Sequence, residues 1–147
     1  MHTSAAHHRI RFRSRGASLG LAASSSAELI RNLERGLSFH ALQSLASHSG
    51  LSVARLAPIL GIPERTLARR KSSGKLTLDE SERLLRLSTV FEKTVELFEG
   101  DVAAAVNWLN TPKRALQNHI PLEYSRTELG AREVEDLIGR LEHGVIW

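Results

Sequence analysis

The stretch V-A-R-L-A-P-I-L-G-I-P-E-R-T-L-A-R-R-K, which ends at Lys71, most constrains how this chain can fold. Leu56, Ala57 and Leu60 recur at the spacing of one apolar face of a helix. Gly61 follows them and tolerates the positive φ of a sharp turn between helices. Pro63 suits the first turn of a second helix, because its missing N–H would be unpaired there. The stretch therefore predicts a helix-turn-helix motif.

The second helix of this motif carries strong positive charge around Leu67, which we expect to be its inward anchor. Such a helix is either a solvated basic surface or the partner of a polyanion, because Arg and Lys bind phosphates and Arg pairs with guanine edges. The Pro start, the small-x-x-x-Gly turn and the one-sided arginines favour DNA. We expect bases to be contacted by Arg65, Thr66 and Arg69, and phosphates by Arg70, Lys71, Ser72 and Lys75.

The composition of the chain limits which other kinds of site and partner are possible. The chain has 147 residues and a formal net charge of +4, enough for one compact domain or two small ones and favourable to an anionic partner. The lack of cysteine excludes disulfides and thiolate sites. Since no apolar run approaches the roughly 20 residues of a membrane span and no signal peptide is evident, we expect a cytoplasmic protein without membrane contact.

The N-terminal residues 1–26 are rich in His, Ser, Ala and Arg, and we expect a flexible arm. His7 and His8 adjoin, but two histidines without a third ligand make a poor metal site. Arginine occupies every second position from Arg9 to Arg15, so this segment is either a short strand or an arm against DNA. Its role stays open.

Helix signals run through the rest of the chain. Caps are expected at Ser26, Ser38, Ser52, Asp101 and Thr127, and Thr77 with Glu80 forms a capping box. The box opens the longest helix, about 78–99, whose apolar surface is wide enough for burial on two sides, against the motif and against the next domain or a second subunit. Inward residues are expected to include Leu29, Ile30 and Leu33 in helix 27–35, and Ala131, Val134, Leu137, Ile138 and Leu141 in helix 128–143.

These signals predict an all-α fold: a flexible arm (1–26), a helix-turn-helix and dimerisation region (27–99) and a small helical domain (100–147). A short turn is expected over 111–117 and a loop over 118–124. The tail Val145-Ile146-Trp147 is unusual, since each large apolar side chain would gain about 1.5–3 kcal/mol from burial. It either folds back on its own helices or enters another protein.

The C-terminal third contains W-L-x-x-P at Trp108–Pro112 and P-L-E-x-x-x-T-x-x-G-A at Pro121–Ala131. With these motifs, the segment from about Leu97 to Val145 resembles the toxin-binding C-terminal domain of the Xre/MbcA/ParS antitoxins. The stretch L-A-P-I-L-G-I-P-E-R-T-L-A-R-R-K-S-S-G-K-L-T, followed by E-S-E-R-L-L-R-L, is similar to the Cro/Xre-like helix-turn-helix of the same proteins. Further matching residues are Ala105, Leu116, Arg140, His143 and Gly144.

The resemblance implies an antitoxin of a RES–Xre module, in which a RES-domain toxin consumes NAD+ and the antitoxin binds and silences it. It also implies repression of the shared operon. In the family, the last helix and tail lie near the toxin's active site. A pocket for a dinucleotide is expected to be electropositive, so it would complement acidic side chains, and an indole could occupy the space of a flat ring. The toxin-contacting residues implied are Gly130, Glu135, Asp136, Ile138, Glu142, Val145, Ile146 and Trp147.

Two other classes of function compete with this interpretation. A stand-alone transcriptional repressor would share the DNA-binding half and use the C-terminal domain for dimerisation or a small effector. An enzyme has little support, because the seven histidines are scattered, and neither a triad spacing nor a Gly-rich phosphate loop occurs. We therefore expect no catalytic residue, no metal and no cofactor, and a homodimer or higher oligomer that reads paired DNA half-sites.

Overall fold

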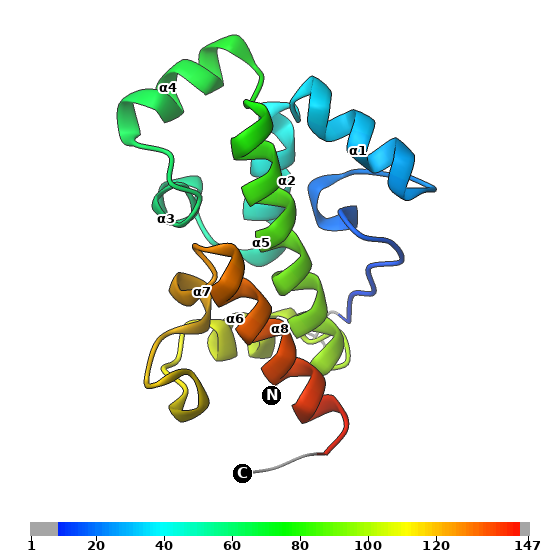
Figure 1. Ribbon diagram of the computed structural model, residues 1–147, viewed down its shortest axis with the longest axis vertical. Coiled ribbons are helices and arrows are strands. Elements are labelled where there is room, and N and C mark those ends of the chain that lie inside the picture. The colour runs from blue at the N-terminus through cyan, green and yellow to red at the C-terminus, as the bar shows by residue number, and fades with distance from the viewer. Residues whose placement is uncertain (1–8, 145–147) are drawn as a thin grey trace, which may run out of the picture. The chain divides into compact units, whose positions relative to one another are not determined.

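A computed structural model describes residues 9–144, which divide into two compact units (Figure 1). The helix-turn-helix unit comprises residues 13–89. The C-terminal unit comprises residues 9–12 together with residues 90–144. Helices and short turns form the described part of the chain, with isolated β-bridges in place of strands, as the sequence predicts. No helix within these residues has both the length and the apolarity that a membrane span requires.

The helix-turn-helix unit consists of short helices packed around one long helix. Its elements are η2 (Ala17–Leu19), α1 (Ser26–Arg35), α2 (Phe39–Ser49), α3 (Val53–Ile59), α4 (Glu64–Ser73) and the first part of α5 (Leu78–Leu97). Its largest fully buried side chains include Leu42, Leu45, Leu56, Leu60 and Leu84, each at most 1% exposed. The apolar face that was predicted for the first helix of the motif therefore lies in the core.

Two details of α1 differ from the prediction. Its cap is Ser25, whose hydroxyl accepts a hydrogen bond from the Glu28 N–H at 3.1 Å, so the helix begins one residue earlier than expected. Glu28 also accepts from the Ser24 N–H at 2.6 Å, which favours this register. Ile30 is 52% exposed because it lies about 100° around the helix from the buried Leu29.

The C-terminal unit is also helical. Besides the end of α5 it contains α6 (Val102–Leu109), η3 (Arg114–Leu116), α7 (Pro121–Tyr124) and α8 (Glu128–Glu142). Its core includes Val90, Val95, Ala105, Leu109, Leu122 and Val134. Leu141 was expected to face inward but is 37% exposed, because α8 extends past the core at its C-terminal end.

Residues 118–124, expected as a loop, include the short helix α7. Pro121 stands at its first position, where the missing N–H is tolerated. The Ser125 hydroxyl donates to the Pro121 carbonyl at 2.8 Å and fastens the end of this turn. A single turn of helix this short leaves little periodicity in a sequence, which is why the turn was missed.

The predicted flexible arm differs most from the structure. Residues 9–12 pack in the C-terminal unit, where the Ile10 N–H donates to the Gly100 carbonyl at 2.9 Å. Residues 13–26 belong to the helix-turn-helix unit, and there Leu19 is 3% exposed against α2. The boundary between the units falls after Thr89 within α5, so this helix serves both units, as its wide apolar surface indicates. His7, His8 and the tail Val145–Trp147 lie outside the described residues.

Candidate nucleic-acid and toxin interfaces

The turn before α4 sets the direction of this basic helix. Gly61 has φ of 70°, as predicted for the sharp turn, and the Ile62 N–H donates to the Ala57 carbonyl at 2.9 Å across it. Ala57, the small residue four positions before this glycine, is 3% exposed. Pro63 occupies the N-cap of α4, one position before the first turn that was predicted for it. These contacts fix the start of α4.

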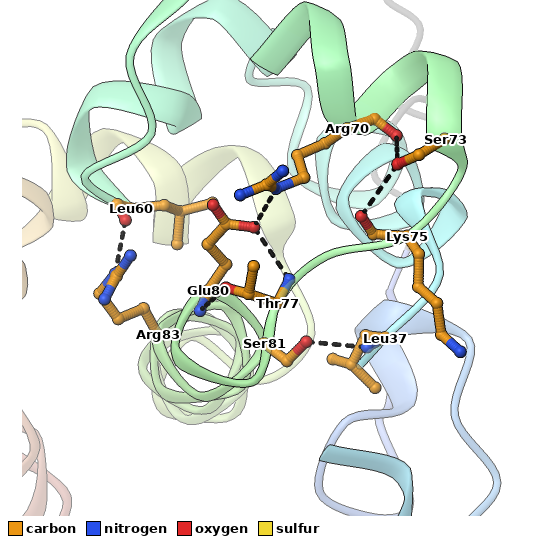
Figure 2. Close-up of polar contacts among 9 residues, drawn as sticks. All are labelled: Leu37, Leu60, Arg70, Ser73, Lys75, Thr77, Glu80, Ser81 and Arg83. Atoms are coloured by element: carbon orange, nitrogen blue, oxygen red, sulfur yellow. Dashed lines mark hydrogen bonds and ion pairs between the residues drawn. The ribbon is translucent and has the colours of Figure 1, made fainter. Parts of the chain in front are cut away.

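Polar contacts from α5 hold the same region (Figure 2). Arg83 Nε donates to the Leu60 carbonyl at 2.6 Å, which occupies one of the carbonyls at the end of α3. Glu80 Oε1 accepts from Arg70 Nε at 2.7 Å and from the Thr77 N–H at 3.0 Å. The Glu80 N–H in turn donates to the Thr77 hydroxyl at 3.1 Å, which confirms the predicted capping box. Glu80 thus joins the start of α5 to the middle of α4.

The ionisation of Glu80 reflects these contacts. Burial by itself would raise the pKa of the Glu80 carboxyl, but the hydrogen bonds from Arg70 and Thr77 outweigh burial and hold the pKa below the usual 4.5. The same bond raises the pKa of Arg70. Arg70, expected to hold a phosphate, is only 21% exposed at its side chain and pairs with Glu80. Its geometry fits an anchor for α4 better than a direct DNA contact.

The far end of α4 is fixed by the backbone. Gly74 ends the helix with φ of 80°, and its carbonyl accepts from the Phe39 N–H at 2.9 Å. The Leu76 N–H donates to the Leu37 carbonyl at 2.8 Å. The Leu37 N–H donates to the Ser81 hydroxyl at 2.8 Å (Figure 2). Both ends of α4 are therefore tied to the rest of the unit.

The outer face of α4 is basic and open. None of its residues is buried, and Leu67, expected as an inward anchor, is only half-buried because no element extends far enough to cover it. Thr66 is half-buried as well. The remaining predicted DNA-contacting residues, other than Arg70, are exposed: Arg65, Arg69, Lys71, Ser72 and Lys75. The site is a rigid helix that presents cations to solvent.

The predicted toxin-contacting residues of α8 separate into two groups. Ile138 is 1% exposed and Gly130 is buried, so both support the helix rather than form its outer surface. Asp136 and Glu142 are exposed. Glu135 is intermediate in exposure: it is half-buried, and its carboxylate pairs with Lys93 Nζ at 2.8 Å within the C-terminal unit.

Leu129 is the surface residue that the sequence reasoning missed. It is 69% exposed on the first turn of α8. Glu133 and Asp136, four and seven residues further on, share its face and are exposed. The signal was present in the sequence, since Leu129 lies two residues before the inward Ala131 and hence about 200° around the helix.

A compact loop precedes α7 in the same unit. The Lys113 N–H donates to the His119 carbonyl at 3.1 Å, and Gln117 and Asn118 both have positive φ. Lys113 Nζ lies 4.7 Å from the ring centroid of Trp108, a cation–π distance, and burial lowers the pKa of Lys113. Trp108 therefore acts as a half-buried packing residue of this loop. In residues 9–144 no cluster of three His, Cys, Asp or Glu side chains is arranged to hold a metal.

Known proteins share both halves of this architecture. Residues 28–88 match the model of the antitoxin Xre-like helix-turn-helix domain, and residues 93–144 match that of the antitoxin Xre/MbcA/ParS C-terminal toxin-binding domain. The chain is 40% identical over 128 residues to the antitoxin Xre of Yersinia enterocolitica, covering 86% of each chain. It is 36% identical over 129 residues to that of Photorhabdus laumondii, covering 87% of each, and 32% identical over 84 residues to that of Pseudomonas putida, covering 56% of this chain and 52% of the relative. The chain therefore belongs to the Xre antitoxins, with a helix-turn-helix domain followed by an Xre/MbcA/ParS C-terminal domain.

Proposed function

We propose that this antitoxin binds and occludes the active site of a RES-domain toxin that consumes NAD+, and that it binds operator DNA to repress its own operon. The observation that carries the DNA half is the basic helix α4, fixed at both ends and open on its outer face. The toxin half rests on membership of the Xre antitoxins and on the exposed acidic face of α8.

For DNA, Arg65 and Arg69 make the base contacts in the major groove, because the first turns of the second helix of such a motif reach the base edges. Thr66 lies beside them. Lys71 and Lys75 hold phosphates, with Ser72 as a neutral donor. Arg70 keeps α4 at its angle through Glu80. One such helix covers too little DNA for useful specificity, so a homodimer recognises the operator by binding paired half-sites.

The DNA test compares single alanine variants by operator binding over a range of salt concentrations. Arg65→Ala and Arg69→Ala should each lose about 1–3 kcal/mol of discrimination between operator and altered sequences. Lys71→Ala and Lys75→Ala should weaken all sequences alike and lower the salt slope by about 0.9 each. Arg31→Ala, an exposed cation on α1, is the control. Equal effects of Arg31→Ala and Arg69→Ala would contradict the proposed role of α4.

For the toxin, Glu133 and Asp136 give the outer face of α8 two exposed acids beside the exposed Leu129, and Glu142 is exposed at the C-terminal end of the helix. A pocket that binds a dinucleotide pyrophosphate is electropositive and complements this face. The tail Val145–Trp147 follows α8 in the sequence, and the indole of Trp147 enters the pocket. Inhibition is then by occlusion, without chemistry by the antitoxin.

The toxin test uses a chain that lacks residues 145–147, in cells that carry the toxin. We expect NAD+ to fall when this chain replaces the full one, whereas operator repression in a reporter strain should persist. Leu129→Asp combined with Asp136→Lys should weaken the complex from the side of α8, and Glu96→Lys, a charge reversal at an exposed acid on α5, serves as the control. Full protection of NAD+ by both altered chains would refute occlusion by this end of the protein.

A further inference from the structure

Residues 9–12 bind the corner between α5 and α6, although they stand at the other end of the sequence. Arg9 Nη1 donates to the Phe98 carbonyl at 3.3 Å and to the Glu99 carbonyl at 3.1 Å, both at the C-terminus of α5. Ile10 N–H bonds the Gly100 carbonyl at 2.9 Å, and Arg9 forms a β-bridge with Asp101. A cation at this helix end satisfies carbonyls that lack partners within the helix and complements the helix dipole.

The corner has room for this segment because residue 100 is glycine. A Cβ at Gly100 would come within 2.9 Å of both the N and O atoms of Ile10, closer than real Cβ contacts. Gly100 also has φ of 91°, a conformation that L side chains rarely adopt. The glycine therefore meets two requirements, and only one of them, the turn itself, is evident from the sequence.

Phe12 supplies the apolar part of the contact. Its ring lies 5.6 Å from that of Phe91, which is 3% exposed, at an interplanar angle of 57°. Ile10 and Phe12 are half-buried whereas Arg11 is exposed, the alternation of an extended segment with one face packed. The alternating arginines thus differ in their surroundings, and Arg9 donates to backbone carbonyls.

Packing contacts run from this corner through α6 and α7 to α8, the helix that carries the acidic face. Asp101 caps α6 by accepting from the Ala104 N–H at 3.1 Å, and α6 packs on α7. In turn α7 packs on α8, where Gly130 lies against the Tyr124 carbonyl. We propose that residues 9–12 form a strap that completes the toxin-binding unit, and that Arg9 and Phe12 are positioning residues for toxin binding. They lie well outside residues 93–144, to which the toxin-binding domain model matches.

The experiment measures toxin affinity and operator affinity for the same full-length variants. Arg9→Ala with Phe12→Ala should weaken toxin binding by about tenfold or more, with operator affinity unchanged within about twofold. Arg11→Ala removes an equal charge from the exposed side and should leave both unchanged. Replacing Phe12 by Leu instead of Ala should restore most of the toxin affinity that Phe12→Ala loses, because an apolar side chain again covers Phe91. A loss of general stability would lower operator affinity as well and would not depend on which arginine is changed.

A glycine pair tests the strap from the other side. Gly100→Ala adds a Cβ against Ile10, whereas Gly50→Ala adds one at a similar φ of 76° in open space. Only the first should weaken toxin binding. The inference rests on the proposed toxin binding and fails separately from it: absence of binding by the unaltered chain refutes the proposed function. If the unaltered chain binds the toxin and the Arg9→Ala/Phe12→Ala chain binds it equally well, the strap is refuted and the proposed function stands.

Discussion

The sharpest stability prediction concerns Gly130 at the start of α8. Its N–H donates to the Thr127 hydroxyl at 3.0 Å, which caps the helix as predicted. A Cβ at this position would overlap the carbonyl oxygen of Tyr124 and lie 3.1 Å from Thr127 Oγ1. Gly139 lies on the same helix, and a Cβ there would meet nothing within 4 Å. The two glycines therefore allow the packing cost to be measured against the helix-propensity gain.

The expected magnitudes have opposite signs. Replacing a helical glycine by alanine stabilises by about 1 kcal/mol, which is the whole expected effect of Gly139→Ala. At Gly130 the added methyl meets backbone, which cannot rotate away, so the overpacking cost lies near the upper end, about 3 kcal/mol. The net effect of Gly130→Ala is a loss of about 2 kcal/mol. The two variants should therefore differ by about 3 kcal/mol, or roughly 6–12 °C in Tm for a chain of this size.

The assay is urea unfolding followed by tryptophan fluorescence. The chain has two tryptophans, and a Trp147→Phe background leaves Trp108 as a reporter within the C-terminal unit. Circular dichroism of the whole chain shows whether the helix-turn-helix unit unfolds in the same transition. If Gly130→Ala proves as stable as Gly139→Ala, the close packing of α7 on α8 is wrong. Comparable losses at both positions would instead mean that propensity arguments fail on this helix.

Two further predictions concern the helix-turn-helix unit. The ionised Glu80 carboxylate stabilises the unit at every pH above its unfolded pKa of about 4.5, and this stability is lost as the pH falls through its lower folded pKa. The thermal stability of the unit should therefore fall at acidic pH. In Glu80→Gln the same measurement should give a flatter pH profile. Ser52→Ala should cost about 1 kcal/mol in the same measurement, because it removes the hydroxyl that accepts from the Arg55 N–H at 3.0 Å, whereas Ser52→Gly should cost only a few tenths.

The sequence was most informative where structure depends on neighbours two to four residues apart. The caps at Ser38, Ser52, Asp101 and Thr127 follow this rule, since each side chain accepts from an N–H two or three residues ahead. The same short range explains why the α3–α4 turn at Gly61 was predictable. A local signal needs no knowledge of what the rest of the chain does.

Long-range contacts were beyond the sequence. Arg70 looks like any other cation of α4, and only its distance from Glu80 shows that it is an anchor. Arg9 contacts carbonyls 89 and 90 residues further along, and no periodicity connects them. Helical spacing also gives the direction of a side chain but not the extent of what covers it. Leu67 and Leu141 point as predicted yet are not buried, because no element extends far enough over them.

The two proposed interfaces are held in place by different forces, so substitutions can impair one without the other. The basic helix α4 has no buried residue of its own and depends on directed contacts from Glu80 and Arg83, which one substitution or one protonation removes. The face of α8 rests on apolar burial of Val134 and Ile138 and on the close approach at Gly130, which change little with pH. A pH below about 4.5 should therefore destabilise the helix-turn-helix unit before the C-terminal unit, and overpacking of α8 should have the opposite order of effects.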